Sequence, residues 1–500
     1  MIPYGKFLLG ASALSLLTFA GCTTSGDDEL DIFDQVYAPE DFGSIPNDEV
    51  FKTSWDALND YQKEFEWCYE ILDYFYLFAH SDSLEPPGSE WYNRLERRST
   101  YIGKGSKYLH PKDYMPSQIL DTYYMFMMMN DQYTTYIDPS YMSFDEVIDD
   151  MNEREPGSDL GILARMVKSE TDSAIIITQI LKGSAADIDG TLEINDTIVS
   201  MNGIERFPLS YFEMFSTGDI GHSVVVTAKK NGTGELVEAR LTIVSYTIPT
   251  VTYQIIDNIA VISISEFAAK NTTSKRGTYG EFLEALEATR KTDATVIDLR
   301  GNPGGDGDQC DSVSMAMLPK GSILTIQYLP KDTLLEDRQE IVIDTVIAEE
   351  NGPAKNRYLV FVADSASGSC SEYTLASVLV NRNSPLVGQN TYGKGVAYTL
   401  YETYLKGAAI FTVAIAYDKN HETFHMHGIE PDVHIDDHDA MLDTAIAIAK
   451  EKTMTRTAGY GKNITPNYQA FSYFKKPVDF GHVPSRKELG RYKVMRKKIR

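Results

Sequence analysis

The spacing of hydrophobic residues changes several times along the chain, and each change predicts a different kind of structure. Over residues 45–150, apolar side chains recur every three or four positions, which places them on one face of a helix. The clearest run is Trp55, Leu58, Tyr61, Phe65, Cys68, Tyr69, Leu72 and Phe75. We therefore predict an N-terminal helical region at 45–150.

Two further patterns follow. Residues 157–246 carry short strand-like runs, such as 175–177, separated by small turns. In residues 250–455, strand-like runs at 259–264 and 358–363 alternate with segments of helical spacing at 279–290 and 439–450. This alternation predicts a mixed α/β (α+β) core in the C-terminal half.

The two ends of the chain differ from its body. Residues 7–20 are mostly apolar but too short for a permanent membrane span, so residues 1–22 are predicted to be a secretory signal. A polar tether at 23–44 follows. Residues 456–500 hold 12 Lys and Arg against 2 Asp and Glu. This basic C-terminal extension either docks on an acidic or anionic surface or is simply solvated, and both interpretations stay open.

Composition narrows the function classes. With 43% hydrophobic and 24% charged residues the chain is an ordinary globular protein, and its net charge of −26 argues against nucleic-acid binding. There are four cysteines; if Cys22 carries lipid, three thiols remain, which is not a disulfide scaffold. We expect free thiols and no cofactor.

The main candidate chemistry is a serine-rich turn at 364–372, between the strand-like run 358–363 and a predicted helix at 373–380. Such a turn presents a hydroxyl at a helix N-terminus, where the N–H groups favour negative charge. A serine needs a base, and Lys394 in the turn 391–395 can serve if burial keeps it neutral. A third turn, at 300–305 after a strand, offers backbone N–H groups for an oxyanion.

Together these three segments resemble the carboxyl-terminal processing, or tail-specific, serine protease family. The resemblance implies that Ser369, three residues before Glu372, is the nucleophile and that Lys394, 25 positions later, is its base. It also implies an oxyanion hole from the Cys370 N–H and the N–H of Gly304 or Gly305. Cys370 remains a rival nucleophile, because a thiolate is intrinsically the better one.

Two positions depart from that family. Many members have a Gln four residues after the lysine, which helps to orient it, and this chain has Tyr398 there. Some have an Asp eleven residues after the serine, where this chain has Val380. The dyad is therefore expected with a different set of supporting residues.

Residues 157–246 resemble a PDZ domain, which implies capture of an extended peptide by strand addition, with its C-terminal carboxylate held by backbone N–H groups. The matching loop is Asp159, Leu160, Gly161 and Ile162. The usual first glycine is Asp159 here, and its charge would repel a ligand carboxylate. Tail capture and a purely structural role remain two open interpretations.

The segment ending at Cys22 resembles a bacterial lipobox, which implies lipidation of Cys22 and a membrane anchor. The acidic residues that follow resemble export signals of surface lipoproteins. We therefore expect an envelope protein, an outer-membrane lipoprotein of a Gram-negative bacterium facing the periplasm or the surface.

One rival motif is His421-Glu422-Thr423-Phe424-His425, which matches the H-E-x-x-H zinc signature. That chemistry needs a helix, and the flanking residues predict a hairpin, so we expect no metal; His425 or His427 would line the cleft instead. The sequence predicts a serine endopeptidase of the cell envelope acting on protein or peptide substrates through a Ser–Lys dyad, with the PDZ region for substrate capture or regulation. The alternatives are a non-catalytic peptide-binding scaffold on a protease-like fold and a zinc metallopeptidase.

Overall fold

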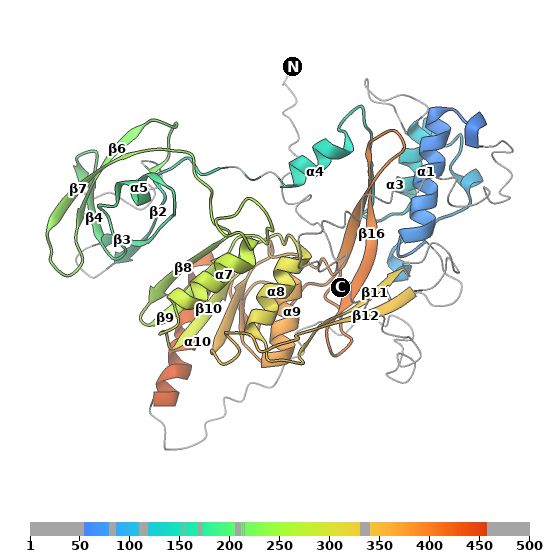
Figure 1. Ribbon diagram of the computed structural model, residues 1–500. Coiled ribbons are helices and arrows are strands. Elements are labelled where there is room, and N and C mark those ends of the chain that lie inside the picture. Colours follow the sequence, from blue (N-terminus) through green and yellow to red (C-terminus); the bar gives the residue numbers. More distant parts are fainter. Residues whose placement is uncertain are drawn as a thin grey trace.

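The computed structural model describes residues 55–79, 87–109, 119–152, 154, 156–168, 173–205, 212, 214, 216–330 and 341–457. Figure 1 shows three regions in a row, with a small β-rich region at one end, a layered α/β region in the middle and N-terminal helices at the other end. The predicted mixed α/β fold is confirmed.

A six-stranded, mostly parallel sheet forms the middle region. Only its β8–β9 pair is antiparallel. The strand order is β17 (Val433–His434), β14 (Leu386–Gly388), β13 (Leu359–Ala363), β10 (Ala294–Asp298), β9 (Ile259–Ile264) and β8 (Val251–Ile256).

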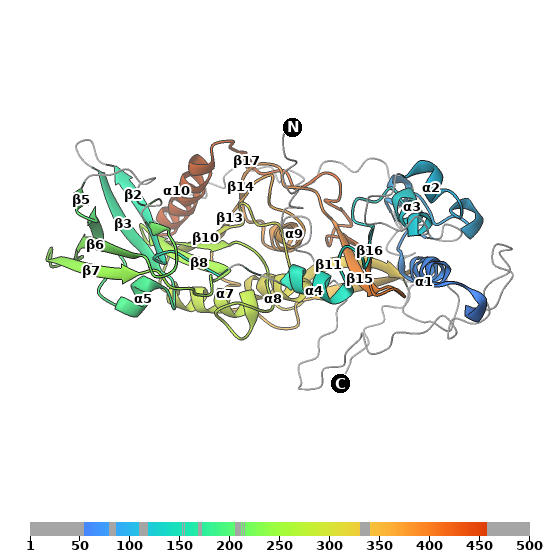
Figure 2. The same ribbon diagram turned by 90° about the horizontal axis from the view of Figure 1, so that it is seen from above.

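Helices cover both faces of this sheet, as Figure 2 shows. On β10, Ile297 packs into a core shared with α7 (Gly277–Ala288), α8 (Gly307–Met317) and α9 (Cys370–Arg382). Its neighbour Val296 points the other way, toward α10 (His438–Thr457). Burial on two faces explains why β10 and β13 are apolar throughout instead of alternating.

A second, antiparallel sheet joins the middle region to the N-terminal helices. Its order is β1 (Thr135–Ile137), β16 (Ala408–Tyr417), β11 (Ile323–Pro330) and β12 (Ile341–Ile347), with β15 (Val396–Glu402) also paired to β16. The N-terminal helices are α1 (Asp60–Phe75), α2 (Gly105–Tyr108), α3 (Leu120–Met128) and α4 (Phe144–Asn152), with 3₁₀ turns at Trp55–Ala57, Ser89–Trp91 and Arg98–Thr100.

The N-terminal region is therefore helical as predicted, with one strand that the periodicity did not reveal. Residues such as Phe65 and Leu72 of α1 share a core with Phe411 of β16. Strand β1 lies antiparallel to β16, with Thr135 opposite Ile410. The N-terminal region is thus hydrogen-bonded into a sheet of the C-terminal half.

The β-rich region at residues 156–246 forms a third sheet with its own core. Its order is β2 (Ile162–Lys168), β3 (Ser173–Ile180), β4 (Thr197–Met201), β6 (Ser223–Lys229) and β7 (Leu236–Thr242), with β5 (Ile204–Glu205) on β4 and the short helix α5 (Ala185–Asp189) beside them. In β6, Val224, Val226 and Ala228 are buried and alternate with more exposed residues, as expected for a sheet with one solvated face.

The middle sheet positions the candidate chemistry. Strands β14, β13 and β10 are parallel neighbours. The turns at 389–395, 364–369 and 300–305 follow their carboxyl ends directly. Because these ends meet at one edge of the sheet, segments that are far apart in the sequence come together there.

Candidate active site

Ser369 lies immediately before helix α9 in a backbone conformation that non-glycine residues rarely adopt. Its φ is +49° and its ψ is −115°. Such conformations cost about 1–3 kcal/mol and persist where the surroundings impose them. Here the Gly368 N–H donates to Asn302 O at 3.0 Å, and the Ser367 hydroxyl donates to Leu299 O at 2.8 Å. The β13 turn is therefore fixed against the β10 turn.

One buried carboxylate connects the predicted nucleophile to the predicted base. Oε2 of Glu372 accepts the backbone N–H groups of Ser369 at 2.9 Å and Lys394 at 2.8 Å. Oε1 accepts the Gly393 N–H at 2.6 Å and the Thr391 hydroxyl at 2.5 Å. Burial raises the pKa of Glu372 to about 7, and these four donors oppose that rise. The structure therefore brings the backbones of Ser369 and Lys394 together at one carboxylate oxygen.

Lys394 is 4% exposed. Burial lowers its pKa from the usual range to about 7, and the nearby Cys370, Asp131 and Glu372 partly oppose the shift. A lysine with this pKa supplies a neutral amine near neutral pH, which is the property that a general base requires.

Two aromatic rings face the amine of Lys394. The Nζ atom lies 4.2 Å from the ring centroid of Tyr398 on β15 and 4.6 Å from that of Tyr133. The sequence singled out Tyr398 as a departure from the family, but it assigned no role to Tyr133, which lies in the loop before β1.

The glycine turn after β10 leaves one donor available. The Gly304 N–H donates to Asn302 Oδ1 at 2.8 Å and is engaged. Gly305 has a φ of +137°, and a Cβ there would lie 2.0 Å from the Phe267 carbonyl oxygen, so only glycine fits. Within the described parts of the chain, the N–H groups of Gly305 and Cys370 donate to no acceptor. This favours Gly305 over Gly304 as the second predicted oxyanion donor.

The other possible nucleophiles in the turn already donate hydrogen bonds within the protein. The Cys370 thiol donates to Gly305 O at 3.3 Å, and burial raises its pKa, so the thiolate is disfavoured. The Ser371 hydroxyl donates to Asn302 O at 2.9 Å. These contacts favour Ser369 over the rival Cys370.

The H-E-x-x-H segment lies in an irregular turn after β16 and, as predicted, not in a helix. The predicted hairpin does not form, because the next strand, β17, pairs with β14 in the other sheet. His425 is buried, and its Nδ1 accepts the Gly395 N–H at 3.1 Å, while its Nε2 lies 2.6 Å from the Tyr92 hydroxyl. Because Nδ1 is an acceptor, Nε2 carries the proton of the neutral ring and donates to Tyr92. Burial lowers the pKa of His425 to about 3. Across the described ranges, no group of three or more His, Cys, Asp or Glu side chains is placed to hold a metal ion.

In the PDZ-like region, the carboxylate loop binds a carboxylate of its own chain. Oδ1 of Asp159 accepts the Gly161 N–H at 2.6 Å and the Tyr246 hydroxyl at 2.6 Å. The preceding N–H, of Leu160, donates to Ser216 O at 3.0 Å. Two N–H groups that a peptide carboxylate would use are therefore occupied within the protein.

The geometry of this loop depends on its glycine. Gly161 has a φ of +69°, and a Cβ there would lie 2.0 Å from the Ser184 side chain. Strand β2 begins at Ile162, directly after the left-handed Gly161, which interrupts the extended backbone.

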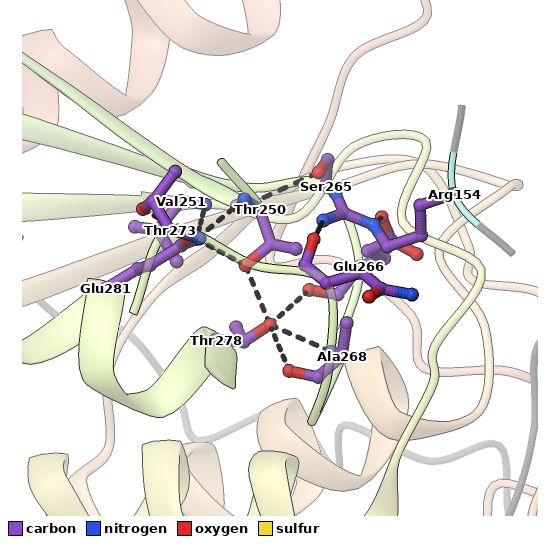
Figure 3. Close-up of polar contacts among 10 residues, drawn as sticks. Arg154, Thr250, Val251, Ser265, Glu266, Ala268, Thr273, Thr278 and Glu281 are labelled. Atoms are coloured by element: carbon purple, nitrogen blue, oxygen red, sulfur yellow. Dashed lines mark hydrogen bonds and ion pairs between the residues drawn. The ribbon is translucent and has the colours of Figure 1, made fainter. Parts of the chain in front are cut away.

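A polar network connects the exit of the PDZ-like region to the middle α/β region (Figure 3). Oε2 of the buried Glu281 on α7 accepts the N–H groups of Thr250 at 2.6 Å and Val251 at 3.0 Å, and also the Thr250 hydroxyl. Oε1 accepts the N–H of Thr273 at 2.7 Å. The start of β8 is thus held against α7.

The segment that leads into the PDZ-like region is also connected to the glycine turn at 300–305. Arg154 forms an ion pair of 2.5 Å with Glu266 (Figure 3). The next residue, Phe267, donates its N–H to Gly304 O at 2.8 Å and accepts the Asp306 N–H at 2.7 Å. The loop that carries the ion pair is therefore hydrogen-bonded to the turn that contains the predicted oxyanion donors.

The predicted signal, Cys22 and nearly all of the basic extension lie outside the described residues. Within the part of the chain that the structure describes, no helix has the length and apolar character needed to cross a bilayer.

Comparison with known proteins identifies two domains. Residues 258–435 match the family model described as Peptidase family S41, and residues 151–237 match that of a PDZ domain. The carboxy-terminal processing protease CtpA of Bacillus subtilis is 30% identical over 322 residues, which cover 62% of this chain and 62% of the relative. A carboxyl-terminal-processing protease of Synechocystis sp. is 26% identical over 275 residues, covering 53% of this chain and 60% of the relative.

These matches span about three fifths of the length of each relative. A solved structure of a photosystem II D1 C-terminal processing protease aligns with a TM-score of 0.45 and 18% identity, covering 76% of this chain and 94% of that one. Residues 258–435 of this chain are therefore similar to peptidase family S41, residues 151–237 ahead of them are similar to a PDZ domain, and the chain is similar to carboxyl-terminal processing proteases.

Proposed function

We propose that this protein is a serine endopeptidase that uses Ser369 as nucleophile and Lys394 as general base. Neutral Lys394 takes the hydroxyl proton while the serine oxygen attacks the peptide carbonyl. The same amine then returns the proton to the leaving nitrogen. A water molecule, activated by Lys394, hydrolyses the acyl-enzyme.

The oxyanion of each tetrahedral intermediate is bound by the N–H groups of Cys370 and Gly305. A pair of preorganised backbone donors of this kind contributes several kcal/mol, about 2.7–4 per donor where one has been removed in other proteases. The dipole of α9, whose first residue is Cys370, adds favourable potential at the same point.

The observation that carries this proposal is the shared carboxylate. Glu372 accepts the N–H groups of both Ser369 and Lys394 on one oxygen, while burial leaves the lysine with a pKa of about 7. A protein that only binds peptides does not need a carboxylate that holds a strained serine next to a lysine with a lowered pKa. This arrangement therefore favours a catalytic protein over a non-catalytic peptide-binding scaffold.

Digestion of casein or a fluorogenic peptide by the wild type and three variants tests the proposal. Ser369→Ala and Lys394→Ala should each reduce cleavage to background, and the double variant should be no worse, because the two residues act as a unit. The exposed Lys291→Ala is the matched lysine control and should retain full activity.

Two results would contradict the assignment. Equal activity of Ser369→Ala and the wild type would exclude Ser369 as the nucleophile. Complete inactivation by Cys370→Ala alone would indicate a thiol enzyme. Loss of activity in EDTA that zinc restores would support the metallopeptidase alternative.

We propose that the PDZ domain contacts peptide chains by strand addition along β2 and binds free C-termini only weakly. Support comes from Asp159, whose carboxylate accepts the Gly161 N–H, and from the engaged N–H of Leu160. A ligand carboxylate would have to displace Asp159 first. Substrates are therefore protein or peptide segments, with the terminal carboxylate as a secondary determinant.

We propose a location in the cell envelope through a lipid on Cys22, as an outer-membrane lipoprotein. The support is the apolar run that ends in Ala20-Gly21-Cys22. Labelled palmitate should enter the wild-type protein in its native host and should not enter Cys22→Ser. An unlabelled wild type would refute the anchor without touching the catalytic assignment.

A further inference from the structure

The amine of Lys394 lies between two ring faces that come from distant parts of the chain. Tyr398 belongs to β15, four residues after the lysine, and its ring centroid is 4.2 Å from Nζ. Tyr133 belongs to the N-terminal region, and its ring centroid is 4.6 Å from Nζ. Both distances are within the range of about 6 Å at which a ring face attracts a cation.

The Tyr133 ring is held in this position by a buried network. Asp131 accepts the Tyr133 N–H at 2.9 Å, and its other oxygen accepts the hydroxyls of Thr134 at 2.8 Å and Thr412 at 2.6 Å. Thr412 lies on β16, the strand that pairs with β1. A carboxylate anchored to the sheet therefore sets the backbone from which the ring projects.

The chemistry at Lys394 makes these ring faces relevant. A neutral amine gains little from an aromatic face, whereas an ammonium ion gains about 2 kcal/mol or more at a desolvated site. In the proposed reaction the lysine becomes an ammonium ion when it takes the Ser369 proton, and burial opposes that charge. Groups that favour only the charged form act in the transition state and not in the resting enzyme.

We propose that Tyr133 and Tyr398 form an aromatic cage that binds the ammonium form of Lys394 as Ser369 attacks the substrate. The inference rests on the proposed function. During acylation the proton moves from the serine oxygen to Nζ as the new C–O bond forms. It moves from Nζ to the leaving nitrogen as the C–N bond breaks, and the cage releases a neutral amine again.

The remaining groups around the amine act in the same or the opposite direction. Desolvation disfavours the ammonium ion, and the carboxylates of Asp131 and Glu372 favour it, as would Cys370 in its thiolate form. His425 also interacts with Lys394, but burial lowers its pKa to about 3 and holds it neutral. The tyrosines differ from all of these groups because their contribution depends on an intact ring face and not on a charge.

The first measurement is independent of turnover. In the Ser369→Ala background, competitive labelling with acetic anhydride, read by mass spectrometry, gives the pH midpoint of Lys394 reactivity. Tyr398→Leu and Tyr133→Leu should each shift that midpoint down by about one pH unit, a tenfold change in proton affinity. Tyr398→Phe and Tyr133→Phe keep the ring and should leave the midpoint within a few tenths of a unit.

The second measurement uses the active enzyme. The acid limb of kcat/KM against pH should move down with the labelling midpoint in the Leu variants, and the plateau of kcat should fall about tenfold with KM unchanged. The Phe variants should match the wild type in both respects. If the protein shows no peptidase activity, the labelling shifts still test the aromatic cage around Lys394. Failure of the proposed peptidase function can therefore be distinguished from failure of the cage.

A third measurement covers the case in which a Leu variant does not fold. Replacing the Tyr398 ring by phenylalanine and by a fluorinated phenylalanine keeps the shape and weakens only the ring face, so the fluorinated form should show the lower midpoint. Equal midpoints for the fluorinated and ordinary rings, or for the Leu and Phe variants, would mean that the two rings only pack in the core, and would overturn the proposal.

Discussion

Ser369 and Lys394 donate their backbone N–H groups to the same oxygen atom, Oε2 of Glu372. The first of these bonds is local, between a residue at a helix N-terminus and a glutamate three positions later. The second crosses to the neighbouring turn. The proposed nucleophile and the proposed base are thus positioned by one side chain, and a displacement of that side chain changes both.

Glu372→Gln should lower kcat/KM by about two orders of magnitude, since small displacements of reacting groups have effects of that size. The amide replaces one of two accepting oxygens with an NH2 group that faces backbone N–H donors. Exposed Glu284→Gln on α7 is the matched control and should behave as the wild type in peptide hydrolysis. Unchanged kinetics in Glu372→Gln would show that the shared oxygen is not needed.

The pH dependence of kcat/KM should rise through about pH 7 and level off above it, because Lys394 must be deprotonated and its pKa is about 7. Glu372 must be ionised, and its pKa is also about 7. The acid limb should therefore be steeper than a one-proton titration, and the two groups titrate as a pair. In Glu372→Gln the residual activity should follow a slope of one. A rate that is flat from pH 5 upward would contradict the lysine base.

Lys394→Met should abolish cleavage and raise stability at pH 7. The folded pKa of Lys394 is lowered, so between about pH 7 and the unfolded lysine value near 10.4 the unfolded chain binds more protons, and wild-type stability rises with pH. Methionine removes this cost, which is a few kcal/mol at most by that linkage. Urea unfolding at pH 7 and pH 9.5 should show the advantage of Lys394→Met shrinking at the higher pH. A constant difference would mean that Lys394 does not titrate anomalously.

Removal of the Asp159 carboxylate should make the PDZ domain bind free C-termini more tightly. Asp159→Gly frees the Gly161 N–H and removes a repulsive charge, so matched peptides with a free C-terminus should bind about tenfold more tightly than to the wild type. Asp159→Asn keeps an acceptor for that N–H and should fall between the two. Amidated peptides should bind all three proteins alike.

The decisive contrast is within the wild type. Calorimetric titration of free-acid and amidated peptides into the unmodified protein should give similar affinities. A wild type that already binds the free acid far more tightly would mean that Asp159 leaves the loop without difficulty when a ligand arrives.

The sequence revealed those parts of the site that are encoded locally. The strand–turn–helix pattern around Ser369 and the separation from Lys394 were both readable, as was the glycine turn after β10. A glutamate three residues after a helix N-cap also predicts a bond to the N-cap N–H. Its further bonds to Gly393 and Lys394 depend on the adjacent turn and could not be read from any local pattern.

Residues from the N-terminal region were beyond such reasoning. Tyr133 lies just before β1, whose pairing with β16 places it near Lys394, and a three-residue strand leaves no clear periodic signal. Tyr92 contacts His425 from the end of the 3₁₀ turn Ser89–Trp91, far away in the sequence. The same limit applies to Asp159. Its charge suggested repulsion of a ligand, whereas the structure adds that the side chain itself occupies the loop.

The pairing of β1 with β16 means that the shortest functional unit is larger than the matched protease domain. A fragment that begins near residue 258 would lack β1 and Tyr133, so one wall around Lys394 would be open to water, and a hydrated lysine is protonated at neutral pH. The proposed base is therefore expected to become competent only after segment 133–137 has folded onto segment 408–410. Under the proposed mechanism, partly folded or truncated chains would then lack a competent base.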